Sequence, residues 1–253
     1  MTDNPTNNNR LDREQKHAEV LLSDPEGIWG WASPAGAIRA QRRAKLIIEA
    51  ANISPDSKTL EIGCGTGLFT EFVSKTGAEI TACELAEQLI SLAAKRSYSS
   101  DVQFLNQDIS SIGPEYDNRY DVVWGSSVLH HLDLDIFLPK LFNLIRPGGC
   151  LVFAEPNMLN PQIWLERNVN CIRRKTGTSP DETAFYRRSL KKCLLRKGFI
   201  NVSIKPHEFL HPATPELLIP LMQLLSFFAE KLWGVREIAG SLLIKAQKPE
   251  SPK

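Results

Sequence analysis

The sequence predicts an α/β fold: a doubly wound sheet of seven strands, with an N-terminal helical lid and a helical cap insertion. Three observations support this prediction. From residue 59 onward, short apolar runs alternate with segments whose apolar residues recur at helical spacing. Residues 120–125 are nearly all apolar, which is typical of a strand covered on both faces. The segment Gly63-Cys64-Gly65-Thr66-Gly67 follows one such run, and its glycines allow a sharp turn close to a ligand.

Length and composition suit one domain with an elaboration. The chain has 253 residues, 42% hydrophobic and 23% charged, with a net charge of +1. This charge balance predicts no nucleic-acid partner. The N-terminus lacks an apolar signal-peptide core, and no uncharged apolar run is long enough for a membrane span. The five cysteines form no C-x-x-C pair, so we expect reduced, mostly buried thiols and a cytoplasmic protein.

The N-terminal region is predicted to be a lid. Residues 1–15 are polar and rich in asparagine, so we expect them to be disordered. Residues 16–55 are predicted to form helices and a loop that carries Trp29, Trp31 and a turn at Ser33-Pro34-Ala35-Gly36. The following helix has a basic face made of Arg39, Arg42, Arg43 and Lys45.

The main domain is predicted to span residues 56–247, with strands and helices in alternation. Strands are expected at 59–62, 79–83, 102–105, 120–125, 150–154, 200–205 and 241–246. Helices are expected at 66–76, 86–96, 133–145 and 189–197, the last with Ser189 as its N-cap. Cap insertions are expected at about 156–188 and 212–238, and residues 248–253 form a flexible tail.

The glycine segment is specific in its spacing. A dinucleotide fingerprint would need a glycine at position 68, where Leu68 stands. Glu61-Ile62-Gly63-Cys64-Gly65-Thr66-Gly67 instead resembles motif I of the class I S-adenosylmethionine (SAM) dependent methyltransferases, which have a Rossmann-like sheet. Other matches to this class follow in order: Glu84 after the second strand, Asp108 after the third, a stretch from Ser126 to Leu132, and Arg146-Pro147-Gly148-Gly149. The resemblance covers roughly residues 58–155.

The resemblance implies that SAM is bound and that S-adenosylhomocysteine is released. Glu84 would accept the ribose hydroxyl protons, Asp108 would bond the adenine amino group, and its apolar neighbour would pack on the ring. Arg39 or Arg43 would pair with the methionine carboxylate. The implied cofactor-binding residues are Glu61, Gly63, Cys64, Gly65, Gly67, Glu84, Leu85, Asp108, Ile109, Ser126 and Arg39.

The family reaction is an in-line displacement at the SAM methyl group. The enzyme contributes alignment and, where the acceptor needs it, removal of a proton. His130 and His131 follow the fourth strand and are candidate bases, although one of them could instead order the loop. Glu155 ends the fifth strand and is a candidate for binding the acceptor, or else a polar strand end.

A second motif matches a zinc-binding pattern. His207-Glu208-Phe209-Leu210-His211 matches H-E-x-x-H, which binds zinc only when a helix puts both histidines on one face. Prolines at 206 and 212 bracket the motif, and it continues an alternating strand. We therefore predict no metal site, although these residues could line the acceptor pocket.

Residues 214–233 form an unusually apolar segment that bears on what kind of acceptor is bound. They predict a helix that is apolar over most of its girth, kinked at Pro220, with a narrow polar stripe of Gln223, Ser226 and Glu230. Three roles remain open: burial against residues 156–188 as a cap over the acceptor site, a hydrophobic acceptor channel or shallow membrane contact aided by nearby basic residues, and a homodimer interface.

These observations predict a cytoplasmic methyltransferase, with or without peripheral membrane contact, that modifies oxygen or carbon of a small, fairly hydrophobic acceptor. A quinone precursor, a lipid-linked intermediate and a secondary metabolite all fit. Two alternatives remain: a SAM-binding regulatory protein without catalysis, and a nicotinamide-dependent oxidoreductase, against which Leu68 argues.

Overall fold

The computed structural model describes residues 23–169 and 183–250. The predictions for residues 1–15 and for Cys171, and part of the predicted insertion at 156–188, lie outside these ranges.

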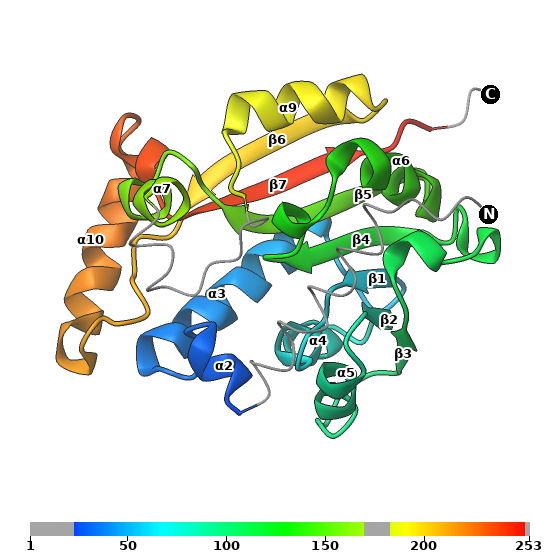
Figure 1. The fold of residues 1–253 in the computed structure, drawn as a ribbon, viewed down its shortest axis with the longest axis horizontal. Coiled ribbons are helices and arrows are strands. Elements are labelled where there is room, and N and C mark those ends of the chain that lie inside the picture. The colour runs from blue at the N-terminus through cyan, green and yellow to red at the C-terminus, as the bar shows by residue number, and fades with distance from the viewer. Residues whose placement is uncertain (1–22, 170–182, 251–253) are drawn as a thin grey trace.

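A single seven-stranded sheet has the order β3-β2-β1-β4-β5-β7-β6, which confirms the predicted doubly wound architecture (Figure 1). β5 and β6 both pair antiparallel with β7, whereas the other neighbouring strands are parallel. The strands are β1 (Lys58–Ile62), β2 (Glu79–Glu84), β3 (Val102–Asn106), β4 (Tyr120–Ser126), β5 (Ile145–Pro156), β6 (Ile200–His207) and β7 (Ser241–Gln247). The strand order reverses between β1 and β4, and ligands bind such sheets in the crevice at that point.

Helices cover both faces of the sheet. The α-helices are α2 (Pro25–Ile28), α3 (Pro34–Ala51), α4 (Leu68–Ser74), α5 (Glu87–Ala93), α6 (Leu134–Leu144), α7 (Pro161–Asn168), α9 (Arg187–Arg196) and α10 (Ile219–Lys231). Successive strand residues point to opposite faces, so they contribute to two cores. On one face Val122 and Trp124 pack with residues of α3 and α4. On the other, Val123 packs with residues of α6 and α9.

Several element boundaries differ from the prediction for local reasons. Ser33-Pro34 is not a turn but the start of α3, where the Ser33 hydroxyl accepts from the Gly36 N–H and Pro34 occupies the first turn. α9 begins at Arg187 with Tyr186 in the N-cap position, so Ser189 lies inside the helix.

Two predicted irregularities are also placed differently. Arg146-Pro147-Gly148-Gly149 lies within β5, where the register with β4 shifts and Gly148 has a φ of +79°. Pro220 lies in the first turn of α10, where its missing N–H costs nothing, so it starts the helix instead of kinking it. Lys248, predicted to lie in the flexible tail, donates from Nζ to the carbonyls of Phe142 and Ile145 at 2.8 Å.

α10 does not form the predicted buried cap. Within it only Ile219 and Ser226 are buried, and its inner side packs on Ala35, Ile38 and Leu210. The predicted burial of its apolar girth against residues 156–188 is therefore wrong for the described part of the chain. Among the described residues, no helix is long and apolar enough to cross a membrane.

Candidate functional site

The glycine loop lies at the carboxyl end of β1. Gly63, Gly65 and Gly67 have φ values of +66°, +53° and +78°, a region that side chains other than glycine rarely adopt. A Cβ on Gly63 would stand 2.7 Å from the Val128 side chain, and one on Gly67 would stand 2.2 Å from the Tyr98 hydroxyl. Sterics therefore require glycine at both positions.

Two acidic side chains follow β2 and β3 at the same edge of the sheet. Glu84 accepts hydrogen bonds from the N–H groups of Gly65 and Ala86, at 2.9 and 3.0 Å. Asp108 caps a short helical turn that begins at Ile109, accepting from the Ser110 N–H at 2.8 Å. Both carboxyl groups belong to the lining of one pocket, as the order of the motifs predicts.

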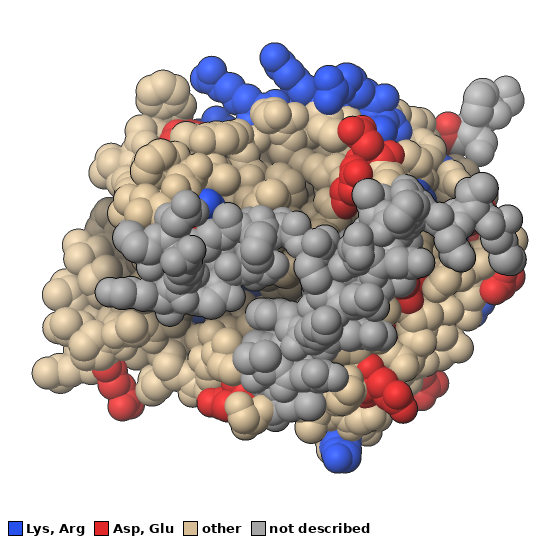
Figure 2. Space-filling view, in the orientation of Figure 1, with Lys and Arg blue, Asp and Glu red and all other residues tan. Residues whose placement is uncertain are grey.

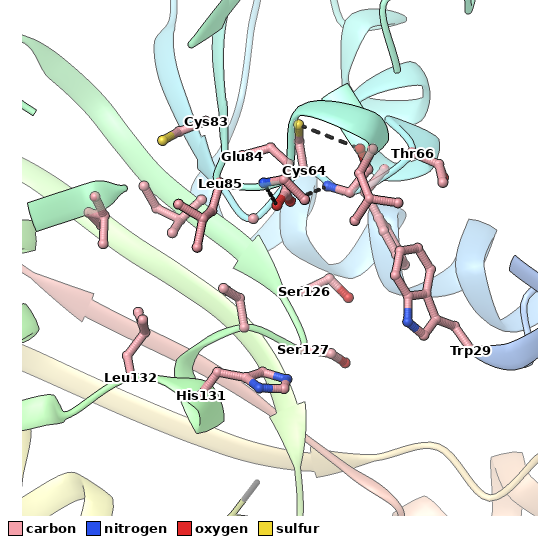
Figure 3. Close-up of a pocket in the computed structure, with 18 of the residues that line it drawn as sticks. Trp29, Cys64, Thr66, Cys83, Glu84, Leu85, Ser126, Ser127, His131 and Leu132 are labelled. Atoms are coloured by element: carbon pink, nitrogen blue, oxygen red, sulfur yellow. Dashed lines mark hydrogen bonds between the residues drawn. The ribbon is translucent and has the colours of Figure 1, made fainter. Parts of the chain in front are cut away.

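The pocket has a volume of about 370 Å³ and lies where the strand order reverses. Cys64 and Thr66 approach from the glycine loop, and Glu84 and Leu85 from the end of β2. Ser126 ends β4, and Ser127, His131 and Leu132 come from the segment that follows it (Figure 3). Of the predicted site residues, those that line it are Gly63, Cys64, Gly65, Glu84, Leu85, Asp108, Ile109, Ser126, His130 and His131.

The residues present fit the donor that the motifs imply. The glycine loop offers a backbone without side chains, Glu84 and Asp108 offer carboxylate acceptors, and buried Ile109 offers an apolar surface. Adenosine without phosphates presents ribose hydroxyls and an amino group for the two carboxylates and an apolar ring for Ile109, so the three features suit it. Gly67 contributes to the turn of the loop through its positive φ, but among the described residues it is not part of the pocket lining.

The N-terminal segment covers the pocket opposite the strand ends. Trp29 and Trp31 line it, and a Cβ on Gly65 would stand 3.1 Å from the Trp29 ring. The Glu26 carboxylate in α2 accepts from the Thr66 hydroxyl at 2.8 Å and pairs with Arg96. The predicted lid is thus attached to the glycine loop by polar contacts.

The basic face of α3 approaches the pocket through Arg43 more closely than through Arg39. Fully buried Arg43 donates to the hydroxyls of Ser126 and Ser127 at 3.1 and 2.9 Å, and both serines line the pocket. Burial lowers the pKa of Arg43 to about 10, so it remains a cation at neutral pH. The Arg39 guanidinium stacks over the Trp31 ring at 5.3 Å, and among the described residues Arg39 is outside the lining.

His130 and Glu155 form a buried pair beside the pocket. The distance from His130 Nδ1 to Glu155 Oε2 is 2.8 Å, and Oε1 accepts from the N–H groups of Val128 and Leu129 at 3.0 and 2.8 Å. Burial lowers the pKa of His130 despite the opposing effect of Glu155, which favours the neutral imidazole. Since Glu155 accepts the Nδ1 proton, Nε2 is left with its lone pair.

The geometry gives Glu155 a different place from the one predicted. It is fully buried and, among the described residues, does not line the pocket, so it orients His130 without contacting an acceptor. His131 lines the pocket, and its ring centroid is 4.2 Å from that of His130. Arg167 of α7 also lines the pocket. Sequence reasoning missed it because nothing local distinguishes it from other arginines of that segment.

Glu61 lies behind the glycine loop. It is buried, accepts from the Thr70 hydroxyl at 2.5 Å, and among the described residues is not part of the lining. Desolvation raises the pKa of Glu61 to about 8, so the carboxyl group is mostly protonated at neutral pH. Its position indicates that it links β1 to α4 beneath the loop.

The H-E-x-x-H segment is not helical. His207 ends β6, Glu208 has a φ of +82°, and His211 lies in the loop that follows. His207 is buried, whereas His211 is exposed and contacts Gln162 at 3.0 Å. The two rings therefore do not share the helical face that zinc binding by this motif requires.

Comparisons with known proteins agree with this geometry. Residues 60–153 match a family model described as a methyltransferase domain. Over 133 residues the chain is 29% identical to a ubiquinone biosynthesis O-methyltransferase of Xanthomonas campestris pv. campestris (strain B100), covering 51% of this chain and 56% of the relative. The enzyme of the same name from Proteus mirabilis (strain HI4320) is 29% identical over 125 residues, covering 48% and 51%. The matched part thus spans about half the length of these relatives.

Solved structures show the same fold. A SAM-dependent methyltransferase from Archaeoglobus fulgidus superposes with a TM-score of 0.55 at 19% identity, covering 82% of this chain and 92% of the other. N-methyltransferase NodS from Bradyrhizobium japonicum WM9, in complex with S-adenosylhomocysteine, has a TM-score of 0.60 at 17% identity, covering 93% and 98%. Residues 60–153 therefore match a methyltransferase domain, and most of the chain shares the fold of solved SAM-dependent methyltransferases.

Proposed function

We propose that the protein transfers the methyl group of SAM to a hydroxyl oxygen of a small, fairly apolar acceptor. The observation that carries the proposal is the His130–Glu155 pair, in which His130 lines the same pocket as the glycine loop and Glu84 and buried Glu155 holds its Nδ1. A neutral imidazole with a free lone pair is needed by an acceptor that must lose a proton. An acceptor carbon or a neutral amine makes less use of such a base.

When bound, SAM supplies a methyl group on a positively charged sulfur; transfer breaks the S–C bond, forms an O–C bond and leaves S-adenosylhomocysteine. His130 Nε2 takes the hydroxyl proton from the acceptor, and the resulting imidazolium is stabilised by the Glu155 carboxylate 2.8 Å from Nδ1. The backbone N–H groups of Val128 and Leu129 donate to Glu155 Oε1 and keep that carboxylate in place during the transfer. Apolar Val128 and Leu132 help to line the acceptor side of the pocket.

The cation Arg167 favours an acceptor whose hydroxyl is acidic, such as a phenol or an enol. A positive charge near the oxygen stabilises the oxyanion that attacks the methyl group. The relatives named above are O-methyltransferases of ubiquinone biosynthesis, which supports an aromatic hydroxyl as the acceptor here.

The test is a methyl-transfer assay with radiolabelled SAM and a matched pair of acceptors, an alkyl-substituted catechol and the corresponding aniline. We expect label on the catechol, no label on the aniline, and loss of transfer in His130→Gln. The variant His131→Gln is the comparison, because His131 lines the same pocket and its ring lies beside that of His130; transfer should fall less in it than in His130→Gln. Equal labelling of both acceptors, or full activity in His130→Gln, would contradict the proposal.

A further inference from the structure

α10 has an inverted arrangement of polar and apolar side chains. Its inner side carries Ser226, which is buried, and Glu230, which pairs with Arg42 of α3 at 2.6 Å and accepts from the Glu208 N–H at 2.9 Å. Ile219 and Met222 pack inward, but most of its apolar residues face solvent, together with those of the flanking turns. The exposed residues are Leu217, Leu218, Leu221, Leu224, Leu225, Phe227, Phe228, Leu232 and Trp233, which we call the apolar surface.

The apolar surface continues onto neighbouring elements. Trp164 and Leu165 of α7 are exposed, as are Val235 and Ile238 of the short helix η5 (Val235–Ile238) that follows α10. The Asn160 side chain, which caps α7, donates to the Ile238 carbonyl at 2.8 Å and holds these elements together. An exposed apolar area built from three elements is larger than scattered surface residues on an ordinary monomer would give.

The apolar surface lies at the end of the molecule that holds the pocket. Figure 1 places α7 and α10 at the end of the sheet toward which β4 points. α7 connects the two regions directly, because Arg167 lines the pocket while Trp164 and Leu165 are exposed. Whatever covers the apolar surface is therefore close to the place where an acceptor would enter.

Positive charge borders the apolar surface. α9 contains five basic residues and no acidic one, and Arg188, Lys191 and Lys192 are exposed. Its first residue, Arg187, pairs with Glu237 of η5 at 3.0 Å, which places the start of α9 beside the apolar surface. Figure 2 shows Lys and Arg gathered along the edge formed by α9, and a largely uncharged region over α10.

We propose that the apolar surface docks on the interface of an anionic lipid membrane, with the exposed cations of α9 at the level of the headgroups. An amphipathic surface of Leu, Phe and Trp bordered by basic residues binds in this way, through buried apolar area and attraction to anionic lipids. Lys231, whose Nζ lies 3.8 Å from the Phe227 ring centroid, matches a cation that reaches to the headgroups while the ring enters the acyl layer.

Charge favours a lipid surface over a second copy of the chain as the occupant. A second copy would bring another strongly basic α9, whereas an anionic bilayer supplies the opposite charge. Glu230 of α10 and Glu237 of η5 are already paired with Arg42 and Arg187 and so add little repulsion. Glu216 is exposed next to Leu217, so its negative charge opposes part of the attraction. This inference goes beyond methyl transfer and holds whether or not the acceptor is a phenol.

The experiment is co-sedimentation of the full chain with vesicles of phosphatidylcholine alone or mixed with phosphatidylglycerol. We expect binding to the mixed vesicles and a loss of at least about tenfold in Leu224→Glu/Phe228→Glu, whose side chains are half exposed. Ile136→Glu is the matched control, because Ile136 is 54% exposed on α6 and outside the apolar surface. It should bind like the unmodified protein.

A second variant tests the charge. Arg188→Ser/Lys191→Ser/Lys192→Ser should weaken binding to the mixed vesicles by about a hundredfold, as expected for three basic residues near an anionic surface, and leave binding to phosphatidylcholine unchanged. No binding by the unmodified protein, or equal binding by Leu224→Glu/Phe228→Glu, would overturn the proposal. A dimer in light scattering that this double variant dissociates, without any vesicle binding, would identify a second copy as the occupant. Binding of S-adenosylhomocysteine by each variant reports separately on the methyltransferase site.

Discussion

Glu155→Gln is the sharpest test of the proposed base, because the substitution preserves shape and changes only charge and donor pattern. Glu155 accepts three hydrogen bonds, from Val128 N–H, Leu129 N–H and His130 Nδ1, at 3.0, 2.8 and 2.8 Å. A glutamine keeps its carbonyl oxygen on the two backbone donors and turns its NH₂ group toward His130. Nδ1 must then accept, so the proton moves to Nε2, and the Nε2 lone pair proposed to take the hydroxyl proton is lost.

The magnitude follows from these contacts. General-base catalysis contributes about 10²- to 10⁴-fold, so kcat should fall by roughly that factor while the affinity for S-adenosylhomocysteine stays unchanged. The free energy of unfolding should fall by only about 1–3 kcal/mol, since one hydrogen bond to a charged group is exchanged for a neutral one. Equilibrium urea unfolding and isothermal calorimetry separate these effects.

The pH profile adds an independent readout. Because the pKa of His130 lies below its ordinary value of 6.5, kcat/KM of the unmodified protein should rise with pH below 6.5 and be level above pH 7. Glu155→Gln should stay low across this range, since raising the pH does not restore the tautomer. Full activity in Glu155→Gln, or an activity restored by raising the pH, would refute the base assignment. His131→Gln, which alters the neighbouring ring, is the matched control.

Three further predictions concern the donor site and the buried titratable groups. Gly65→Ala/Glu84→Ala should weaken binding of S-adenosylhomocysteine at least about a hundredfold in calorimetry. The variant loses the Glu84 carboxylate, which is expected to accept from the ribose hydroxyls and accepts from the Gly65 N–H, and it puts a side chain at a backbone φ of +53°. Gly234→Ala, where a Cβ meets nothing within 4 Å, is the control and should bind normally. The pKa of Glu61 is raised to about 8, so the folded chain binds more protons than the unfolded chain between roughly pH 4.5 and 8, and the free energy of unfolding falls as pH rises through this window. Glu61→Gln should flatten this dependence of the unfolding free energy on pH in urea unfolding. An unchanged dependence would place the titration at another residue. Burial beside arginines holds the pKa of His207 well below 6.5, so the unfolded chain binds more protons and the melting temperature should drop as pH falls below 6.5. His207→Phe should reduce this drop and cost little stability at pH 7, because neither ring nitrogen has a hydrogen-bond partner within the described part of the chain. An equally steep drop in the variant would contradict this.

The donor side of the site could be predicted from sequence because its signals are local and ordered along the chain. In a parallel sheet every strand ends at the same edge, so residues that directly follow β1, β2, β3 and β4 must lie together. Gly65, Glu84, Asp108 and Ser126 were assigned from the resemblance to the methyltransferase motifs, which lie at or just after these strand ends, and all four line one pocket. Glu61 was misplaced by the same reasoning, because a strand residue one step before the turn can point under the loop instead of into the crevice.

The acceptor side depends on contacts between distant segments. His130 and Glu155 are each unremarkable strand-end residues in sequence, and their pairing arises only because β4 and β5 are neighbours. Arg43 reaches Ser126 and Ser127 across more than eighty residues, and nothing in the helix pattern distinguishes it from Arg39. Such pairings depend on the relative placement of elements, which the local pattern does not encode.

Sequence by itself determined the doubly wound sheet and the glycine loop, since hydrophobic periodicity and the positions of glycines are properties of short segments. Only the tertiary structure decided which side of α10 faces the protein. A helix that is apolar over most of its girth does not define its own inner face. In the structure Ser226 is buried and Glu230 contacts Arg42 of α3, whereas Gln223 is exposed. That orientation left the apolar side chains exposed beside the pocket.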